Sequence, residues 1–304
     1  MATTALIALG SNLGDRKANL DLAVASLSAT PGVTVRAVSP YHQTTPIGGP
    51  DGQGAFLNAA ARLETDLDPF ELLQALHAVE AKAGRVRAVR WGERPLDVDL
   101  LTYGRRRILT PELTVPHPRM TVRRFVLAPL AEIAPDDVEI TTGLTVAQLL
   151  SNLDRRPSHV VIDAPPGPSR DELVRHVLAE FPSIDLSASK IPPADSSQRQ
   201  EDQWREFLGE DGWLVSDFHL GCDSVRDKVS LASLYEPPRP GLKNAFPPGR
   251  WPIKPTFIVA LSGGILDERG PREGTGIPIL RPESTEVEGV AREVLAACAA
   301  TRPG

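Results

Sequence analysis

The sequence predicts two domains, an α+β domain of the ferredoxin-like class followed by an α/β domain. The chain has 304 residues, more than the usual single domain. Its first half follows the order strand, helix, strand, strand, helix, strand, which is typical of ferredoxin-like domains with one sheet covered by helices on one face. Its second half alternates strands and helices, a pattern that favours a parallel sheet.

Apolar spacing predicts the elements of the first domain, which we place at residues 1–155. A buried strand at residues 5–9 is followed by a helix that Asp15 or Asn12 can cap, with Leu20, Val24 and Leu27 on one face. A second helix opens at Asp68 and ends at Gly84. Further strands are predicted at residues 33–37, 56–63 and 96–103, and a closing helix at residues 144–153.

The second domain is predicted at residues 156–304, after the polar break at residues 154–157. Strands are predicted at residues 159–162, 213–218 and 256–261, and helices at residues 172–181 and 286–300. Residues 237–255 contain seven prolines. Because each proline removes a backbone donor, this stretch is predicted to be a loop.

Composition excludes several classes of protein. The net charge is -6, and residues 1–156 hold 17 basic against 17 acidic residues, leaving 16 against 22 in the remainder. This balance lacks the broad basic surface that nucleic-acid binding needs. Cys222 and Cys298 form no disulfide or zinc pattern. Without a secretory signal or a bilayer-spanning apolar run, the sequence predicts a soluble cytoplasmic protein.

Two aspartates stand in the strand at residues 96–103. Period-two alternation sends Leu96 and Val98 to the core and both Asp97 and Asp99 to the other face. Two adjacent carboxylates repel each other unless a hard divalent cation, such as magnesium with phosphate oxygens, lies between them. The alternative is an ordinary solvated strand face.

A basic loop precedes these aspartates. Residues 84–94 contain Arg85, Arg87, Arg90, Trp91 and Arg94. Guanidinium groups at this density can grip a polyphosphate through bidentate, charge-assisted hydrogen bonds. They can equally form salt bridges to the paired acids, and the loop alone does not decide between the two.

Two further segments have the composition of a binding site. His117 stands between prolines, with Arg123 and Phe125 after it, although a histidine in this setting is usually a turn residue. Phe56 and Asn58 share a strand face after the segment at residues 41–48, and an aromatic ring beside an amide suits a planar heterocycle. Phe is, however, usually a core residue, and Asn often a turn or cap residue.

Taken together, these four segments and the opening at residues 8–15 resemble the 6-hydroxymethyl-7,8-dihydropterin pyrophosphokinase family over residues 4–153. The resemblance implies a ferredoxin-like fold. It also implies transfer of the terminal diphosphate of ATP, as one unit, to the hydroxymethyl oxygen of 6-hydroxymethyl-7,8-dihydropterin, with release of AMP. No general base stands out in the sequence.

The same resemblance implies roles for individual residues. Asp97 and Asp99 would bind two magnesium ions, and Arg85 and Arg94 would stabilise charge on the moving phosphates. The residues implied at the ATP side are Glu80, Arg87, Arg90, Trp91, His117 and Arg123. The residues implied at the pterin are Thr44, Pro46, Ile47, Phe56, Asn58 and Phe125, with the two aromatic rings on either side of the heterocycle.

The second domain opens with residues 159–171, which resemble the start of deoxynucleoside kinases. A phosphate-binding loop needs glycines, then Lys and Ser or Thr. Ala164, Pro168, Arg170 and Asp171 occupy those positions. We therefore predict a degenerate kinase-like module with a structural, homo-oligomeric or regulatory role, and we expect no metal site at His219 and Cys222, since a second pair of ligands is missing.

Two alternatives to this function stay open. A bifunctional enzyme would add deoxynucleoside kinase activity in the second domain, against which the degraded loop argues. A non-catalytic binding protein would use the first domain as a scaffold, with Asp97 and Asp99 as mere surface charges. Substitution of either aspartate separates the second alternative from an enzyme.

Overall fold

The computed structural model describes residues 2–47, 50, 52–85, 92–155, 158–164, 168–180, 183–185, 213–218, 256–261 and 277–302. The chain divides into two compact units. Unit 1 contains residues 1–140, 144–150 and 299–304, and unit 2 contains residues 141–143 and 151–298. The domain boundary that the sequence suggests, near residue 155, stays a prediction.

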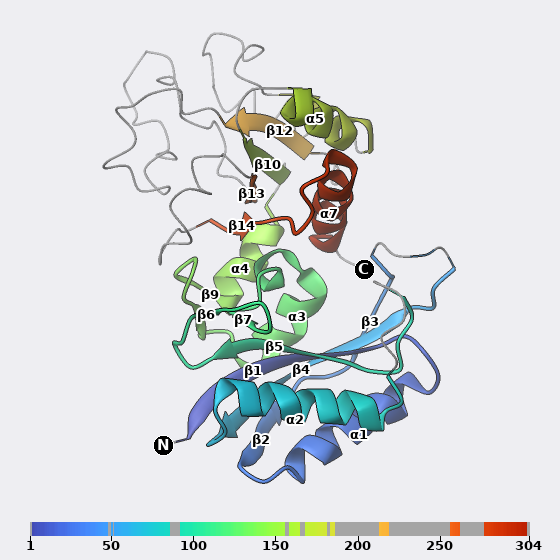
Figure 1. Cartoon of the computed structure of the whole chain (residues 1–304), viewed down its shortest axis with the longest axis vertical. Coiled ribbons are helices and arrows are strands. Elements are labelled where there is room, and N and C mark those ends of the chain that lie inside the picture. The colour runs from blue at the N-terminus through green and yellow to red at the C-terminus, as the bar shows by residue number, and fades with distance from the viewer. Residues whose placement is uncertain are drawn as a thin grey trace. The chain divides into compact units, whose positions relative to one another are not determined.

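Unit 1 is built on an antiparallel sheet (Figure 1). Its strands are β1 (Thr3–Ser11), β2 (Val33–Val38), β3 (His42–Thr44), β4 (Phe56–Thr65) and β5 (Asp97–Tyr103). The order across the sheet is β2-β4-β1-β5, and β3 also pairs with β4. The predicted strands and the α+β class are confirmed. Of these five strands, β3 was not predicted, because three residues show no periodicity.

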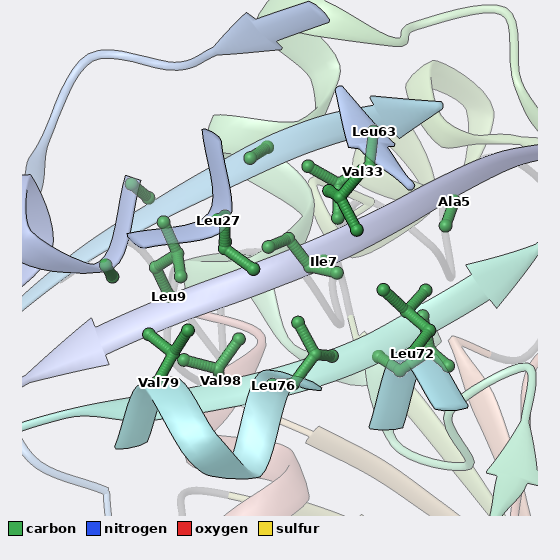
Figure 2. Close-up of a cluster of buried hydrophobic side chains, with 14 of the residues drawn as sticks. Ala5, Ile7, Leu9, Leu27, Val33, Leu63, Leu72, Leu76, Val79 and Val98 are labelled. Atoms are coloured by element: carbon green, nitrogen blue, oxygen red, sulfur yellow. The ribbon is translucent and has the colours of Figure 1, made fainter. Parts of the chain in front are cut away.

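Helices α1 (Arg16–Ser28) and α2 (Pro69–Lys82) pack on one face of this sheet. Asp15 caps α1 by accepting a hydrogen bond from the backbone N–H of Ala18 at 3.0 Å. Asp68 and Glu71 form a capping box at the start of α2. Figure 2 shows the resulting core, in which Leu27, Leu72, Leu76 and Val79 of the helices meet Ile7, Leu9, Leu63 and Val98 of the sheet.

The expectation of helices on only one face of the sheet is wrong. Helix α3 (Arg124–Ile133) packs against β4 on the opposite side from α1 and α2 (Figure 1). Leu6 and Ala60 point to that side and are as buried as their core-facing neighbours. Helix α3 was missed because Pro129 lies within it and three basic residues precede or open it, which hides its apolar periodicity.

Shorter elements complete the first half of the chain. They are strands β6 (Ile108–Leu109) and β7 (Thr114–Val115), a 3-10 turn at Met120–Val122, strands β8 (Val138–Glu139) and β9 (Leu144–Thr145), and helix α4 (Val146–Leu153). The predicted closing helix is therefore confirmed. The turn at Met120–Val122 leads directly into α3 and fixes where Arg123 and Phe125 lie.

Unit 2 contains a parallel sheet, as predicted. Its strands are β10 (Ser158–Asp163), β11 (Ser183–Asp185), β12 (Trp213–Phe218), β13 (Phe257–Ala260) and β14 (Ile279–Leu280), in the order β11-β12-β10-β13-β14. All pairings are parallel, and every residue of the central strand β10 is buried. The predicted helices are α5 (Pro168–Glu180) and α7 (Val287–Ala300).

Other expectations for the second half cannot be compared with the structure. The proline-rich stretch at residues 237–255, His219 and Cys222 lie outside the described residues. Within the described ranges, no helix is both long enough and apolar enough to cross a membrane.

Candidate functional site

The site is organised by strand β5, whose side chains alternate between the two faces of the sheet. Val98 and Leu100 are buried in the core with α1 and α2. Asp97 and Asp99 point to the opposite face, where 23% and 36% of their side-chain surfaces remain exposed. The predicted alternation is confirmed, and it places two half-buried carboxylates side by side.

Asp97 is held by two arginines from the basic loop. Arg85 Nη1 donates to Asp97 Oδ1, and Arg94 Nη1 donates to Asp97 Oδ2 at 2.9 Å. Burial alone lowers the pKa of Arg85, but the charges of Asp97 and Glu80 more than offset this, so its pKa is raised. Arg85 is thus firmly charged, and both arginines donate hydrogen bonds to the carboxylate of Asp97.

Glu80 connects this ion pair to the framework. It comes from the last turn of α2 and is only 3% exposed. Its Oε1 accepts from Arg85 Nη1 and also from the backbone N–H of Val98 at 2.8 Å, between the two aspartates. Glu80 therefore braces Arg85 and the backbone of β5 together.

Asp99 faces a second basic group. His117 Nε2 and Arg123 Nη1 each lie 3.9 Å from Asp99 Oδ2. His117 Nδ1 accepts from the backbone N–H of Arg119 at 3.1 Å, so the ring proton is on Nε2, the nitrogen nearer Asp99. A fifth of the His117 side chain stays exposed. Burial of the rest, with Arg123 and Arg119 nearby, lowers its pKa to about 3 and keeps the imidazole neutral.

The predicted pterin residues Thr44, Phe56 and Asn58 lie together on β3 and β4. Asn58 Nδ2 donates to Thr44 Oγ1 at 2.8 Å, and Thr44 pairs with Phe56 across the two strands. The guanidinium carbon of Arg94 is 6.0 Å from the centre of the Phe56 ring. The pterin residues and the basic loop therefore border on one another.

Gly10 of β1 lies between the pterin residues and the aspartates. It pairs with Asn58 on one side and with Asp97 on the other. A Cβ at this position would stand 3.1 Å from Asn58 Oδ1 and 4.0 Å from Asp97 Cβ. A glycine here thus lets the two groups of side chains approach on the same face of the sheet.

The remaining predicted residues fall into two groups. Phe125 lies in the first turn of α3, and the guanidinium carbon of Arg123 is 5.6 Å from its ring centre. Pro46 and Ile47 follow β3 and are partly buried. Arg87, Arg90 and Trp91 lie outside the described residues.

Asn12 is a residue of the site to which the sequence alone assigns no role beyond a possible helix cap. Of the two caps that the sequence offers for α1, Asp15 performs that role. Asn12 instead accepts from the backbone N–H of Arg94 through Oδ1 at 2.9 Å and donates from Nδ2 to Gln53 Oε1 at 3.2 Å. No local signal could have revealed this, because its main partner is 82 residues away in the chain.

The donor atoms fit magnesium bound together with a polyphosphate. Asp97 and Asp99 offer hard carboxylate oxygens, which this cation prefers. Among the described residues, no three His, Cys, Asp or Glu side chains gather into a complete metal site. Two carboxylates on one face suit an ion whose other ligands are phosphate oxygens and water, as is common for magnesium.

Comparison with known proteins places the first half of the chain in a family. Residues 6–135 match the model of the family described as 7,8-dihydro-6-hydroxymethylpterin-pyrophosphokinase (HPPK). The chain is 52% identical to a 2-amino-4-hydroxy-6-hydroxymethyldihydropteridine pyrophosphokinase of Bacillus subtilis over 133 residues, 44% of this chain and 79% of that protein.

Proteins of the same name from two other bacteria are also similar. The one from Methylorubrum extorquens is 47% identical over 50% of this chain and 94% of its own length. The one from Synechocystis is 43% identical over 49% of this chain and 76% of its own length. These three similarities each cover half of this chain or less, whereas they cover most of the relative.

Proposed function

Because the chain belongs to the 7,8-dihydro-6-hydroxymethylpterin-pyrophosphokinase family, we propose that the cluster around Asp97 and Asp99 is the catalytic site of its N-terminal half. That half is a 2-amino-4-hydroxy-6-hydroxymethyldihydropteridine pyrophosphokinase of folate biosynthesis. The observation that supports this location is the convergence of two carboxylates and three arginines on one sheet face. These are the charges that phosphoryl-type transfer requires.

The reaction moves a diphosphate between two oxygens. The hydroxymethyl oxygen of 6-hydroxymethyl-7,8-dihydropterin attacks the β-phosphorus of ATP and forms a new P–O bond. The bond between that phosphorus and the oxygen bridging it to the α-phosphate breaks, and AMP leaves. The hydroxyl proton passes to water or to a phosphate oxygen, since no described side chain stands out as its acceptor.

Asp97 and Asp99 would hold magnesium, in our proposal two ions, against the triphosphate. When bound, magnesium neutralises charge on the phosphates and helps to align them with the attacking oxygen. The chain prepares this site by presenting both carboxylates from a rigid strand, with the Val98 amide between them fixed by Glu80. Their period-two spacing keeps both carboxylates on the reacting face.

Arg85 and Arg94 would stabilise the charge of the transferred group. Both now bond Asp97, so phosphate oxygens would share or take over part of their hydrogen bonds. His117 and Arg123, next to Asp99, would contact ATP or the transferred group. Arg87, Arg90 and Trp91 belong to the same basic loop and would close over ATP, which excludes water.

The pterin would be recognised at β3 and β4. Phe56 and Phe125 would stack on its two faces, and Asn58 and Thr44 would hydrogen-bond its edge, with Pro46 and Ile47 beside it. The Asn58–Thr44 hydrogen bond fixes the amide orientation, so the edge of the site is set before substrate binds. A ring lacking the matching groups would leave a buried amide without its partner.

The direct test measures AMP formed by the full-length chain from ATP and magnesium, with and without 6-hydroxymethyl-7,8-dihydropterin. Pterin-dependent AMP is the expected result. ADP as the nucleotide product, or no product at all, would contradict the proposal. Asp97→Asn and Asp99→Asn should then lower the pterin-dependent rate about a thousandfold if the cluster is the catalytic site.

For the second unit we propose a degenerate deoxynucleoside-kinase-like module without phosphoryl transfer. Two observations support this. Strand β10 runs into α5 at the centre of a parallel sheet, where a phosphate-binding loop would stand. At that place Arg170 Nη2 lies 3.1 Å from its neighbour Asp171, whose charge opposes a phosphate. A cytoplasmic location and a structural, homo-oligomeric or regulatory role for this unit complete the proposal.

Kinase assays with thymidine and deoxyadenosine test this second proposal. No ADP above the background without nucleoside is expected. Nucleoside-dependent ADP that Arg170→Ala removes would instead favour the bifunctional enzyme.

A further inference from the structure

We propose that Asn12 is a positioning residue of the transfer reaction, which holds Arg94 in place and couples it to the segment that leads into Phe56. The inference rests on the proposed function, because it assigns Asn12 a role in the same reaction. Asn12 itself touches neither of the two aspartates in the described structure. Its effect would pass through Arg94.

Asn12 and Arg94 are joined by two hydrogen bonds at the end of β1. The backbone N–H of Asn12 donates to the carbonyl of Arg94 at 3.2 Å, and the backbone N–H of Arg94 donates to Asn12 Oδ1 at 2.9 Å. Arg94 then reaches Asp97 with its Nη1. The side chain of Asn12 thus fixes the backbone from which this arginine starts.

The orientation of the Asn12 amide follows from its partners. A backbone N–H can only donate, so the atom it meets must be Oδ1, and Nδ2 must face Gln53 Oε1 at 3.2 Å. Asn12 is 5% exposed, so water does not readily replace either bond. The Asn12 amide both accepts from the Arg94 N–H and donates to Gln53 Oε1, whereas most other side chains of similar size offer only an acceptor or only a donor.

Besides the Asn12–Gln53 hydrogen bond, the segment before Phe56 also contacts Glu93, the residue before Arg94. The backbone N–H of Gly54 donates to Glu93 Oε1 at 3.2 Å. Gly54 also approaches Asn12 closely, since a Cβ there would stand 3.3 Å from the carbonyl oxygen of Asn12. A change on the pterin side of the sheet is therefore mechanically linked to Arg94 through Asn12 and its neighbours.

A double-mutant cycle tests this role. Asn12→Ala, Arg94→Ala and the double variant are compared with the wild type for kcat, for the KM of each substrate and for thermal unfolding. We expect Asn12→Ala to lower kcat about tenfold to a hundredfold, as a small misplacement of a catalytic group does. The KM of ATP should change less than kcat, and in the Arg94→Ala background the Asn12 substitution should cost almost nothing.

Two further variants separate positioning from folding. Asn12→Asp keeps an acceptor for the Arg94 N–H but loses the donor to Gln53 Oε1, and the Gln53 Nε2 is already bonded to the Pro50 carbonyl, so only part of kcat should return. Asn19→Ala is the matched control: Asn19 Nδ2 bonds Ser11 Oγ and the carbonyl of Leu13, in the same turn, without reaching Arg94. It should leave kcat near the wild-type value.

The possible outcomes separate the positioning role of Asn12 from the proposed function of the chain. Additive losses in Asn12→Ala and Arg94→Ala, or a loss matched by Asn19→Ala, would overturn the positioning role while leaving the pyrophosphokinase intact. A wild-type chain without pterin-dependent AMP would instead overturn the proposed function itself.

Discussion

The two units of the chain differ in how their arginine and aspartate side chains are arranged. In unit 1, Arg85 and Arg94 at the two ends of the basic loop and Arg123 just before α3 reach the aspartates of β5. In unit 2, Arg170 lies against Asp171, its own neighbour in the first turn of α5. Arg85 and Arg123 thus come from segments other than β5, and several charges gather on one face of the sheet, whereas Arg170 and Asp171 are neighbours in the sequence.

The largest expected contrast comes from removing one carboxylate in each unit. Asp99→Asn should lower kcat about a thousandfold, because one charge of the phosphate and magnesium site is lost. Its stability should change little, since Asp99 is partly exposed and its two ion pairs are 3.9 Å long. Steady-state AMP formation and thermal unfolding measure the two effects.

Asp171→Asn is the matched control for this comparison. The side chain of Asp171 is 63% exposed, so the protein should fold, and AMP formation should not change. Equal AMP formation in Asp99→Asn and Asp171→Asn would mean that Asp99 contributes no more to catalysis than an exposed carboxylate of unit 2.

Arg85→Ala should reduce both activity and stability. Arg85→Ala removes an ion pair of Glu80, which is 3% exposed, and this should cost about 3 kcal/mol in the free energy of unfolding. Its kcat should fall about a hundredfold, because a charged donor near the phosphates disappears. Denaturant unfolding and AMP assays on the same preparation separate the two effects.

The corresponding change in unit 2, Arg170→Ala, should leave kcat for AMP formation unaltered. Arg85→Lys is informative as well, since it keeps the charge but not the forked geometry that bonds Glu80 and Asp97 together. It should restore stability more than activity. Full activity with lysine would show that charge alone suffices.

Gly10→Ala should affect the pterin more than ATP. The new methyl group would press on Asn58 Oδ1, which stands 3.1 Å from that position, and would turn the amide away from its present orientation. We expect the KM of the pterin to rise about tenfold, the loss of one well-placed hydrogen bond, with the KM of ATP nearly unchanged. Equal increases in both would place Asn58 outside pterin recognition.

The smallest effect concerns pH. The pKa of His117 is lowered to about 3 by burial and by nearby arginines, while an unfolded histidine titrates near its ordinary value of about 6.5. As pH falls below 6.5, His117 binds a proton in the unfolded state but not in the folded state. His117 therefore contributes stability above about pH 6.5 that is lost progressively toward pH 3.

The variant His117→Gln should weaken this acid dependence. Thermal unfolding without ATP or magnesium, followed from pH 7 to pH 4, should show a shallower decline in the variant than in the wild type. Identical slopes would mean that His117 takes up its proton at an ordinary pH in the folded protein.

Regular periodicity explains what the sequence could predict. The alternation in residues 96–103 placed Asp97 and Asp99 on one face, and the structure agrees because a strand leaves no other choice. The long strands and helices of both units followed in the same way. Helix α3 escaped because an internal proline and its basic start hide an otherwise apolar face.

Contacts between distant segments explain what could not be predicted. Glu80 was expected near ATP, but nothing in the sequence indicated that it accepts from the Val98 amide. The sequence offers Asp15 or Asn12 as the cap of α1, and it does not indicate the bond of Asn12 to Arg94, which exists only once β1 and the end of the basic loop are folded together. Such bonds depend on tertiary structure and leave no periodic trace.

The central claim, transfer of a diphosphate as one unit from ATP to the pterin, is tested most directly by label position. The full-length chain is given 6-hydroxymethyl-7,8-dihydropterin and ATP carrying radioactive phosphorus at either the β or the γ position. We predict that both labels appear in the pterin product and that AMP carries neither. A product labelled only from the γ position, with labelled ADP from the β position, would show single phosphoryl transfer and contradict the account.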